Sequence, residues 1–166
     1  MKINKVVVGP LETNCYVLEE DNKCIIIDPG DEYNKIKKVI GDKVVVGVII
    51  THYHFDHIGA LNCFDDNLIL DKNTLEEKEY NIEGFNFEII YTPGHKEDCI
   101  TIYFKNEKVM FTGDFIFKGT IGRMDLEGGS TLDMKESLEK MKKYNKNIKI
   151  YPGHGESTYL FKENLY

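Results

Sequence analysis

All five histidines of the chain lie in three short segments, and the rest of the sequence contains none. The first segment, residues 51–57, reads THYHFDH, and the other two end in Pro-Gly-His at His95 and His154. Imidazole and carboxylate groups this closely spaced are typical ligands of zinc and related ions. The first segment offers more donors than one tetrahedral site normally takes from so short a stretch, so its spacing predicts two neighbouring metal sites. Its donors are His52, His54, Asp56 and His57.

The remaining candidate ligands follow apolar runs that read as strands. Two ions about 3.5–4 Å apart need a bridging oxygen, and Asp114, which follows the run 109–113, is suited to supply it. His95 and His154 each follow a Pro-Gly pair, in which proline fixes φ and glycine permits a sharp turn. Both rings can therefore swing into a shared cleft. Four loops together deliver seven candidate ligands, namely His52, His54, Asp56, His57, His95, Asp114 and His154.

The order of these residues along the chain resembles the metallo-β-lactamase superfamily. The matching set begins at Asp28-Pro29-Gly30, continues through residues 52–57, and ends at His154, so it runs over most of the chain. Three further stretches resemble the hydroxyacylglutathione hydrolase (glyoxalase II)-like branch, especially its short bacterial members. They are Thr13-Asn14-Cys15-Tyr16, residues 121–129 and Tyr151-Pro152-Gly153-His154-Gly155.

This resemblance implies a ligand set, a fold and a chemistry. His52, His54 and His95 would bind the first metal ion, Asp114 would bridge, and the second ion would be bound by Asp56, His57 and His154. The two divalent ions, with zinc expected and iron or manganese as alternatives, would share a hydroxide that Asp56 and Asp114 orient. The expected reaction is hydrolysis of a thioester of the hydroxyacylglutathione type. Arg123, the one arginine of the chain, is the candidate clamp for a substrate carboxylate.

Two departures from the branch bear on the substrate. True glyoxalase II has a C-terminal helical domain that helps to hold glutathione, whereas this sequence ends at Tyr166, so the identity of the thiol stays open. After His95 the branch usually has a small, glycine-containing stretch, whereas this chain has Lys96-Glu97-Asp98-Cys99. We expect the charge of that loop to influence substrate choice.

Other functions remain open at this stage. An iron-dependent persulfide dioxygenase would share nearly all of these motif residues, and a lactone or ester hydrolase would use the same fold. A third class is a metal-binding or partner-binding domain without catalysis. Asp28 either only shapes the turn at Pro29-Gly30 or also supports the His52 loop by accepting a hydrogen bond. Cys99 is expected to be a packed thiol, not a metal ligand.

Length, charge and cysteine usage bound the remaining classes. At 166 residues the chain is sized for a single domain, expected to span residues 1–166. A net charge of -7 argues against a nucleic-acid partner and leaves a small-molecule substrate as the expected partner. The sequence has no apolar run long enough to span a membrane and no signal-peptide pattern, and its four cysteines lack C-x-x-C spacing. We therefore expect buried free thiols and a cytoplasmic protein, with the oligomeric state undetermined.

The elements that must position these loops can be read from periodicity. A helix is expected over Tyr33–Ile40, with Asp31 as its cap. A second helix should follow the capping box at Ser130, with Met134, Leu138 and Met141 as its apolar stripe. The resemblance arranges the whole chain as an α+β, four-layer αββα sandwich. The expected strands cover residues 5–8, 14–18, 23–28, 44–50, 85–91, 100–104, 108–111 and 148–151.

Overall fold

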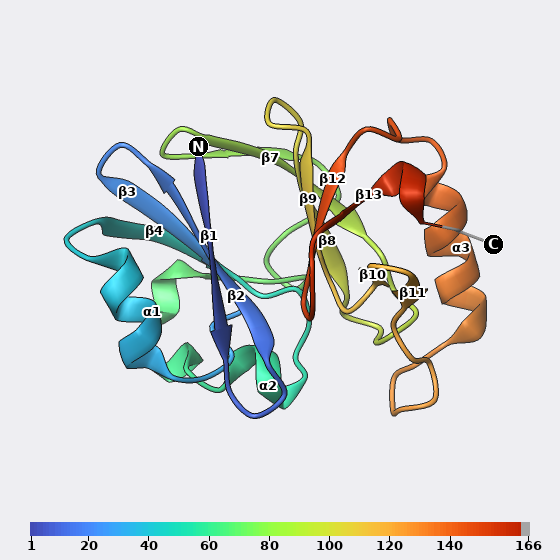
Figure 1. The fold of residues 1–166 in the computed structure, drawn as a ribbon, viewed down its shortest axis with the longest axis horizontal. Coiled ribbons are helices and arrows are strands. Elements are labelled where there is room, and N and C mark those ends of the chain that lie inside the picture. Colours follow the sequence, from blue (N-terminus) through green and yellow to red (C-terminus); the bar gives the residue numbers. More distant parts are fainter. Residues whose placement is uncertain (164–166) are drawn as a thin grey trace.

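The computed structural model describes residues 1–163, which form two β-sheets with helices on their outer sides (Figure 1). The first sheet has the strand order β1-β2-β3-β4-β5 and the second has the order β13-β12-β9-β8-β7-β6. The first sheet contains β1 Lys2–Val8, β2 Thr13–Glu20, β3 Lys23–Ile27, β4 Val44–Ile49 and β5 Ile69–Leu70. The second contains β6 Glu79–Ile82, β7 Phe85–Tyr91, β8 Ile100–Phe104, β9 Val109–Gly113, β12 Lys149–Pro152 and β13 Thr158–Tyr159.

The helices are few, and each is short. Helix α1 (Tyr33–Ile40) and the single turn α2 (Phe55–Ile58) lie beside the first sheet, and α3 (Thr131–Met141) covers the second (Figure 1). A small pair of strands, β10 (Ile116–Phe117) and β11 (Thr120–Ile121), follows β9. The remaining short elements are the 3-10 turns Leu61–Cys63, Asp66–Leu68 and Leu160–Lys162. No helix in residues 1–163 is long and apolar enough to cross a membrane.

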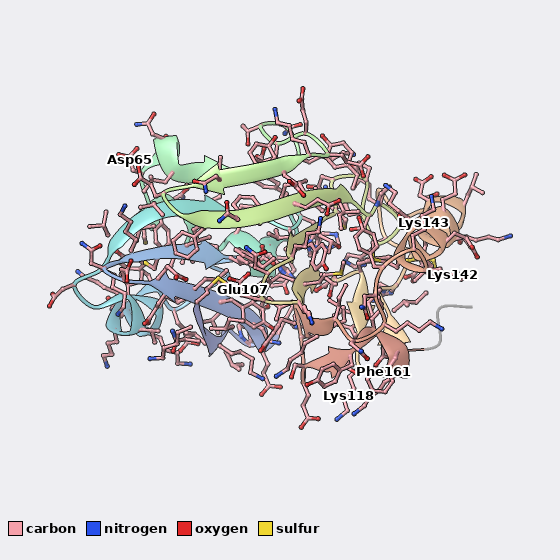
Figure 2. All side chains as sticks on the ribbon, turned by 90° about the horizontal axis from the view of Figure 1, so that it is seen from above. Asp65, Glu107, Lys118, Lys142, Lys143 and Phe161 are labelled. Atoms are coloured by element: carbon pink, nitrogen blue, oxygen red, sulfur yellow. The ribbon has the colours of Figure 1, made fainter. Side chains whose placement is uncertain are left out.

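Three apolar cores separate the four layers. Side chains alternate along a strand with a period of two, so Tyr16 and Leu18 of β2 pack against the second sheet, whereas Cys15 and Val17 face α1. Both faces of the strand are covered, which explains its continuous apolar run. The third core lies between the second sheet and α3 and includes Met134, Leu138 and Met141, as the apolar stripe predicted. Charged side chains such as Asp65, Lys118 and Lys143 project from the outside of these layers (Figure 2).

Most expected elements are found, and the differences have local causes. The bounds of α1, β7 and β8 agree with the prediction, and the other expected strands differ by a few residues at their ends. Ser130 caps α3 by accepting a hydrogen bond from the Asp133 backbone amide, as expected. Periodicity did not predict α2, β5, β6, β10, β11 or β13, because each is four residues long or shorter and shows no repeat.

Two expectations were wrong. Asp31 does not cap α1: the N-cap is Glu32, whose left-handed φ of 46° separates Asp31 from the first turn, and Asp31 accepts a hydrogen bond from the Glu32 amide instead. The expectation of four buried thiols also fails at Cys63, which is exposed at the end of a 3-10 turn. Cys15, Cys24 and Cys99 are buried, and all four cysteines are free.

Candidate metal centre

The candidate ligands are brought together by the carboxyl ends of four strands. Strand β12 runs parallel to β9, so Asp114 and His154, which follow these strands, emerge at the same edge of the second sheet. The loop with residues 52–57 follows β4 of the first sheet, and His95 follows β7. A site between two sheets therefore receives donors from both, and all seven predicted ligands lie in it.

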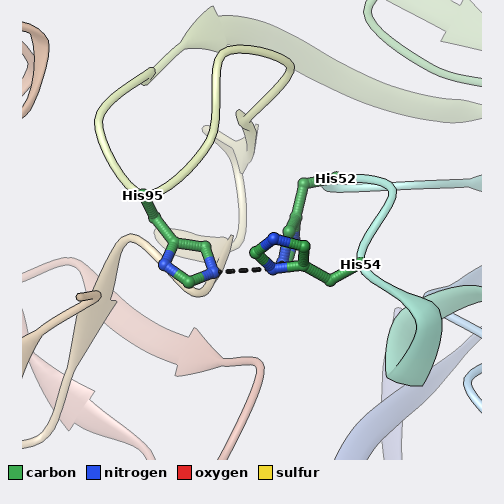
Figure 3. Close-up of side chains that lie close together, drawn as sticks. All are labelled: His52, His54 and His95. Atoms are coloured by element: carbon green, nitrogen blue, oxygen red, sulfur yellow. Dashed lines mark hydrogen bonds between the residues drawn. The ribbon is translucent and has the colours of Figure 1, made fainter. Parts of the chain in front are cut away.

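Three histidine rings from two loops form the first set. The Nδ1 atom of His54 lies 3.1 Å from His52 Nε2 and 2.9 Å from His95 Nε2 (Figure 3). The rings are close to perpendicular in all three pairs, with interplanar angles of 79° to 87°. Ring nitrogens that converge in this way resemble three corners of a tetrahedral site.

A carboxylate and two histidines form the second set. The Oδ2 atom of Asp56 lies 3.4 Å from His57 Nε2 and 3.2 Å from His154 Nε2. Asp56 and His57 are adjacent residues of the single turn α2. His57 is fully buried, whereas His154 is partly exposed. The second set is therefore closed on the His57 side and open on the His154 side.

Asp114 reaches both sets. Its Oδ2 atom lies 3.6 Å from His95 Nε2 and 3.9 Å from His52 Nε2, both in the first set. The same oxygen lies 3.4 Å from His154 Nε2, and Oδ1 lies 3.2 Å from His57 Nε2, both in the second set. One carboxylate thus stands between two groups of nitrogen atoms, which is the position that a bridging ligand requires.

The donor chemistry fits divalent ions. The ligand atoms of each set lie within 4.8 Å of one another, and so do those of a third group, His52, His57 and Asp114. Although His57 Nε2 and Asp114 Oδ1 are buried and 3.2 Å apart, neither makes a hydrogen bond within residues 1–163. Unpaired buried polar atoms are costly, and a cation between them would remove that cost. Assignment of ions to the seven residues stays a prediction.

Each ring that presents Nε2 to the centre is held through its other nitrogen. Such partners fix the tautomer and the orientation of a metal-binding histidine. None of these contacts follows from the histidine spacing, because each partner belongs to another part of the chain or to a neighbouring hydroxyl. The Nδ1 partners are Thr51 Oγ1 for His52 at 3.1 Å, Asp28 Oδ2 for His57 at 2.8 Å, Arg123 O for His95 at 2.7 Å and Leu11 O for His154 at 3.0 Å.

Asp28 supports the ligand loop, as one of its two interpretations expected. Its carboxylate accepts hydrogen bonds from the Thr51 amide at 2.8 Å and the Thr51 hydroxyl at 2.6 Å, in addition to the contact with His57. Strands β3 and β4 are parallel, so Asp28 and Thr51 follow their strands at the same edge. Asp28 has a φ of 51°, unusual for a residue with a side chain. These hydrogen bonds hold it there.

Despite burial, neighbouring carboxylates raise the pKa of both histidines in the second set. Burial disfavours a charged His57, but the neighbouring carboxylates of Asp28 and Asp114 outweigh it and raise the pKa of His57 to about 10. Burial also opposes charge on His154, and Asp114 and Asp56 raise its pKa to about 10. By contrast, burial and neighbouring rings lower the pKa of His52. The carboxylates thus favour positive charge around His57 and His154, where a cation would be bound.

Gly153 is required by the close approach of its loop to the centre. A Cβ atom at this position would lie 2.8 Å from His57 Cε1 and still closer to Asp114 Oδ1. The backbone conformation of Gly153 is not in the left-handed region, so the requirement arises from space alone. Proline then glycine before His154 therefore supplies both the turn and the room for two ligands.

Arg123 and Cys99 lie near the centre but do not contribute side chains to it. The Nε and Nη2 atoms of Arg123 each donate to the carboxylate of Asp125 at 2.7 Å, and the side chain is exposed. The backbone carbonyl of Arg123, in contrast, accepts a hydrogen bond from the ligand His95. Cys99 is 2% exposed, and burial raises the pKa of its thiol, in agreement with a packed thiol.

Two surface openings flank the centre. One lies beside the first set and is lined by His54, Lys96, Glu97, Leu126 and Glu127. The other lies beside the second set and is lined by Phe117, Lys118, His154, Gly155 and Glu156. The unusual loop after His95 therefore forms one wall of an opening next to the ligands, which is where its charge could act on a substrate.

Comparison with known proteins identifies the family. The sequence model described as Metallo-beta-lactamase superfamily matches residues 8–69 and 62–154, a range that includes all seven donors. The chain belongs to this superfamily. The α+β sandwich and the family predicted from the motifs are thereby confirmed, and the superfamily relatives support a metal-dependent hydrolase.

Individual members of the metallo-beta-lactamase superfamily give more detail. The probable metallo-hydrolase YqgX of Bacillus subtilis is 32% identical, over 98% of this chain and 94% of its own length. Hydroxyacylglutathione hydrolase GloC of Haemophilus influenzae is 30% identical, over 98% of this chain and 95% of its own length. The crystal structure of TTHA1623 in a di-iron-bound form superposes with a TM-score of 0.86 at 25% identity, covering 96% of each chain. The alignment with YqgX runs over 199 positions, more than the 166 residues of this chain, so YqgX carries residues that this chain lacks.

Proposed function

We propose that this metallo-beta-lactamase superfamily member is a two-ion hydrolase that cleaves a thioester. The observation that carries the proposal is the position of Asp114. Its Oδ2 atom lies within 4 Å of nitrogen atoms in both ligand sets, and its Oδ1 atom lies within 4 Å of His57 in the second set. Zinc is the expected ion, because the donors are nitrogen and oxygen in small groups of three. Iron and manganese remain alternatives, and the di-iron form of TTHA1623 supports the capacity of this fold for two ions.

The carboxylates around the two ions would have different roles in hydrolysis. Two bound ions would supply a hydroxide nucleophile near neutral pH and polarise the substrate carbonyl. Asp56 and Asp114 carry the negative charge that faces this space, and interactions with His154 and His57 hold the pKa of each carboxyl below its usual range despite burial. Both therefore stay ionised and can orient a water molecule as acceptors. The buried Asp28 keeps the His57 ring in place throughout.

The two openings suit a substrate with groups on either side of its carbonyl. The acyl group and the thiol would occupy the openings beside His54 and His154. A thioester is proposed first because the branch motifs and the relative GloC both point to hydroxyacylglutathione hydrolysis. Lactones and oxygen esters remain alternatives for the same machinery. We place the protein in the cytoplasm with a small-molecule substrate.

The test of this function is a substrate panel with a second detector. Purified protein would be assayed with S-lactoylglutathione, a thioester of an uncharged thiol, a lactone and an oxygen ester, while oxygen uptake is followed with glutathione persulfide. We expect thiol release from at least one thioester and no oxygen uptake. Oxygen consumption without thioester cleavage would replace the proposal with the dioxygenase, and metal-loaded protein inactive in every assay would favour a binding domain.

The role of Arg123 can be tested through its partner. If the guanidinium clamps an anionic substrate, Arg123→Lys should raise KM more than it lowers kcat, because lysine keeps the charge but loses the two-pronged geometry. A substrate carboxylate would compete with Asp125, which now accepts from two of the three guanidinium nitrogens, Nε and Nη2. Asp125→Asn should therefore lower KM for the anionic substrate. Unchanged steady-state kinetics in both variants would leave Arg123 only its backbone role toward His95.

A further inference from the structure

The hairpin between β1 and β2 makes a dense set of contacts with the second ligand set. The hydroxyl of Thr13 donates to Asp56 Oδ2 at 2.8 Å, and this is the Asp56 oxygen nearest His57 and His154. In the same hairpin the Leu11 carbonyl accepts from Nδ1 of His154. The hairpin thus touches both the carboxylate and the exposed histidine of the second set.

The hairpin also holds the backbone of the loop that carries His154. The Asn14 amide donates to the Gly153 carbonyl at 2.7 Å, and its side-chain amide donates to the carbonyls of Pro152 and Gly155 at 3.0 and 2.9 Å. Thr13 forms an antiparallel bridge with His154. The Asn14 side chain therefore forms hydrogen bonds with the backbone on both sides of His154.

Tyr16 completes the connection from inside the core. Its hydroxyl donates to the Pro152 carbonyl at 2.6 Å, and its ring packs edge-on against Phe111 and Tyr151. Thr13, Asn14 and Tyr16 are each 1–2% exposed, so water does not compete for these hydrogen bonds. The hairpin belongs to the first sheet, whereas Pro152 ends β12 of the second sheet and residues 153–155 follow it, so the connection joins the two sheets at the metal centre.

The first ligand set is held by other residues. His52 is oriented by Thr51, and His95 by the carbonyl of Arg123. Within residues 1–163, the side-chain hydrogen bonds of Thr13, Asn14 and Tyr16 reach Asp56 and the loop of residues 152–155, not the first set. The contacts are therefore selective for one of the two sets.

We infer that Thr13, Asn14 and Tyr16 are positioning residues that set the affinity of the second metal-ion site without touching the first. The inference rests on the proposed two-ion function and assigns a role to the Thr13-Asn14-Cys15-Tyr16 motif. Removing an outer partner of a metal ligand typically weakens metal binding by about 10–100-fold. The hairpin acts on the orientation of Asp56 and His154, so its loss should appear in metal affinity before it appears in the fold.

The test separates the two sites by removing one ligand from each in turn. His54→Ala leaves the second set intact, and His154→Ala leaves the first. Thr13→Val, which keeps the shape of threonine but removes its hydroxyl, is then added to both backgrounds. Zn²⁺ affinity of the chelator-treated proteins is measured by competition with a chromophoric chelator. We expect Thr13→Val to raise the Zn²⁺ Kd by about 10–100-fold in the His54→Ala protein and to leave it unchanged in the His154→Ala protein.

Two further variants distinguish a local effect on the second metal-ion site from a general effect on folding. Tyr16→Phe removes one hydroxyl at the other end of the connection and should weaken Zn²⁺ binding in the same background. Thr101→Val is the matched control, because Thr101 is also a buried threonine, but within the described residues its hydroxyl bonds only to Thr92. It should change neither Kd. Thermal midpoints are recorded for all proteins.

The outcomes distinguish this inference from the proposed function. Equal shifts in the two backgrounds, or none in the His54→Ala protein for either Thr13→Val or Tyr16→Phe, would overturn the positioning role while leaving a two-ion centre intact. A His54→Ala protein that takes up no Zn²⁺ at all would instead contradict the second site, and the proposed function with it.

Discussion

Asp114→Asn should nearly abolish hydrolysis while leaving the fold intact. Asparagine has a similar size and presents a neutral oxygen, so packing around this largely buried residue is preserved. It cannot offset the repulsion of two cations as a carboxylate does. Since the Asp114 carboxylate lies within 4 Å of nitrogen atoms in both ligand sets, one ion should bind more weakly or leave. We expect kcat/KM to fall by roughly two to four decades, on the order of 3–5 kcal/mol of transition-state stabilisation.

The measurement combines metal content, circular dichroism and kcat/KM on one preparation. Asp71→Asn is the control, because Asp71 is another buried carboxylate and asparagine can keep its contacts. The amide oxygen can accept from the turn amides as Oδ1 does, and the NH2 group can donate to the Tyr53 hydroxyl, which now donates to Oδ2. It should keep its metal and most of its activity. An Asp114→Asn protein with two ions and near-normal turnover would show that Asp114 is not the bridge.

Gly153→Ala is expected to have the second large effect, from a single added methyl group. The new Cβ would meet Asp114 Oδ1 and lie 2.8 Å from His57 Cε1, so a ligand or the loop must move. Overpacking of this kind typically costs about 1–3 kcal/mol of stability. Displacement of the ligands should also lower the affinity for the second ion by at least about tenfold, as misplaced ligand partners do. Zn²⁺ titration and thermal unfolding measure the two effects.

Gly47→Ala provides the comparison for this experiment. Gly47 lies in β4, is also buried, and an added Cβ there would make only ordinary contacts, 3.5 Å from Leu70 and 3.7 Å from Ile25. It should bind Zn²⁺ as the unaltered protein does. If Gly153→Ala matched Gly47→Ala in Zn²⁺ affinity, the loop of His154 would be more tolerant than the close contacts indicate.

The candidate centre could largely be predicted because most of its donors lie in short segments of the sequence. Residues 52–57 place four donors next to one another in sequence, and Pro-Gly before His95 and His154 marks the turns that bring in two more. The family resemblance then supplied the order of the layers. Alternation along β2 is consistent with those layers but cannot distinguish the two faces of a strand that is buried on both sides.

Support of the His52 loop by Asp28 was one of two interpretations of the sequence. The other supporting contacts could not be predicted, because they depend on strand pairing and backbone conformation. Asp28 meets His57 only because β3 and β4 are parallel and Asp28 adopts a positive φ. The carbonyls of Leu11 and Arg123 are main-chain atoms, and every residue has one, so no side-chain pattern reveals them. Asp31 was misassigned as a cap for a similar reason: composition permitted it, but the left-handed conformation of Glu32 turned the chain away.

Metal analysis tests the central claim most directly. Protein purified without chelators would be examined by inductively coupled plasma mass spectrometry against an amino-acid-based protein concentration, since seven donors are more than one ion can accept. The two-ion account predicts close to two transition-metal ions per chain, both removed by a strong chelator and both restored by Zn²⁺ together with thioester hydrolysis. A reproducible value near one ion per chain, with iron as the metal and oxygen uptake as the activity, would contradict it.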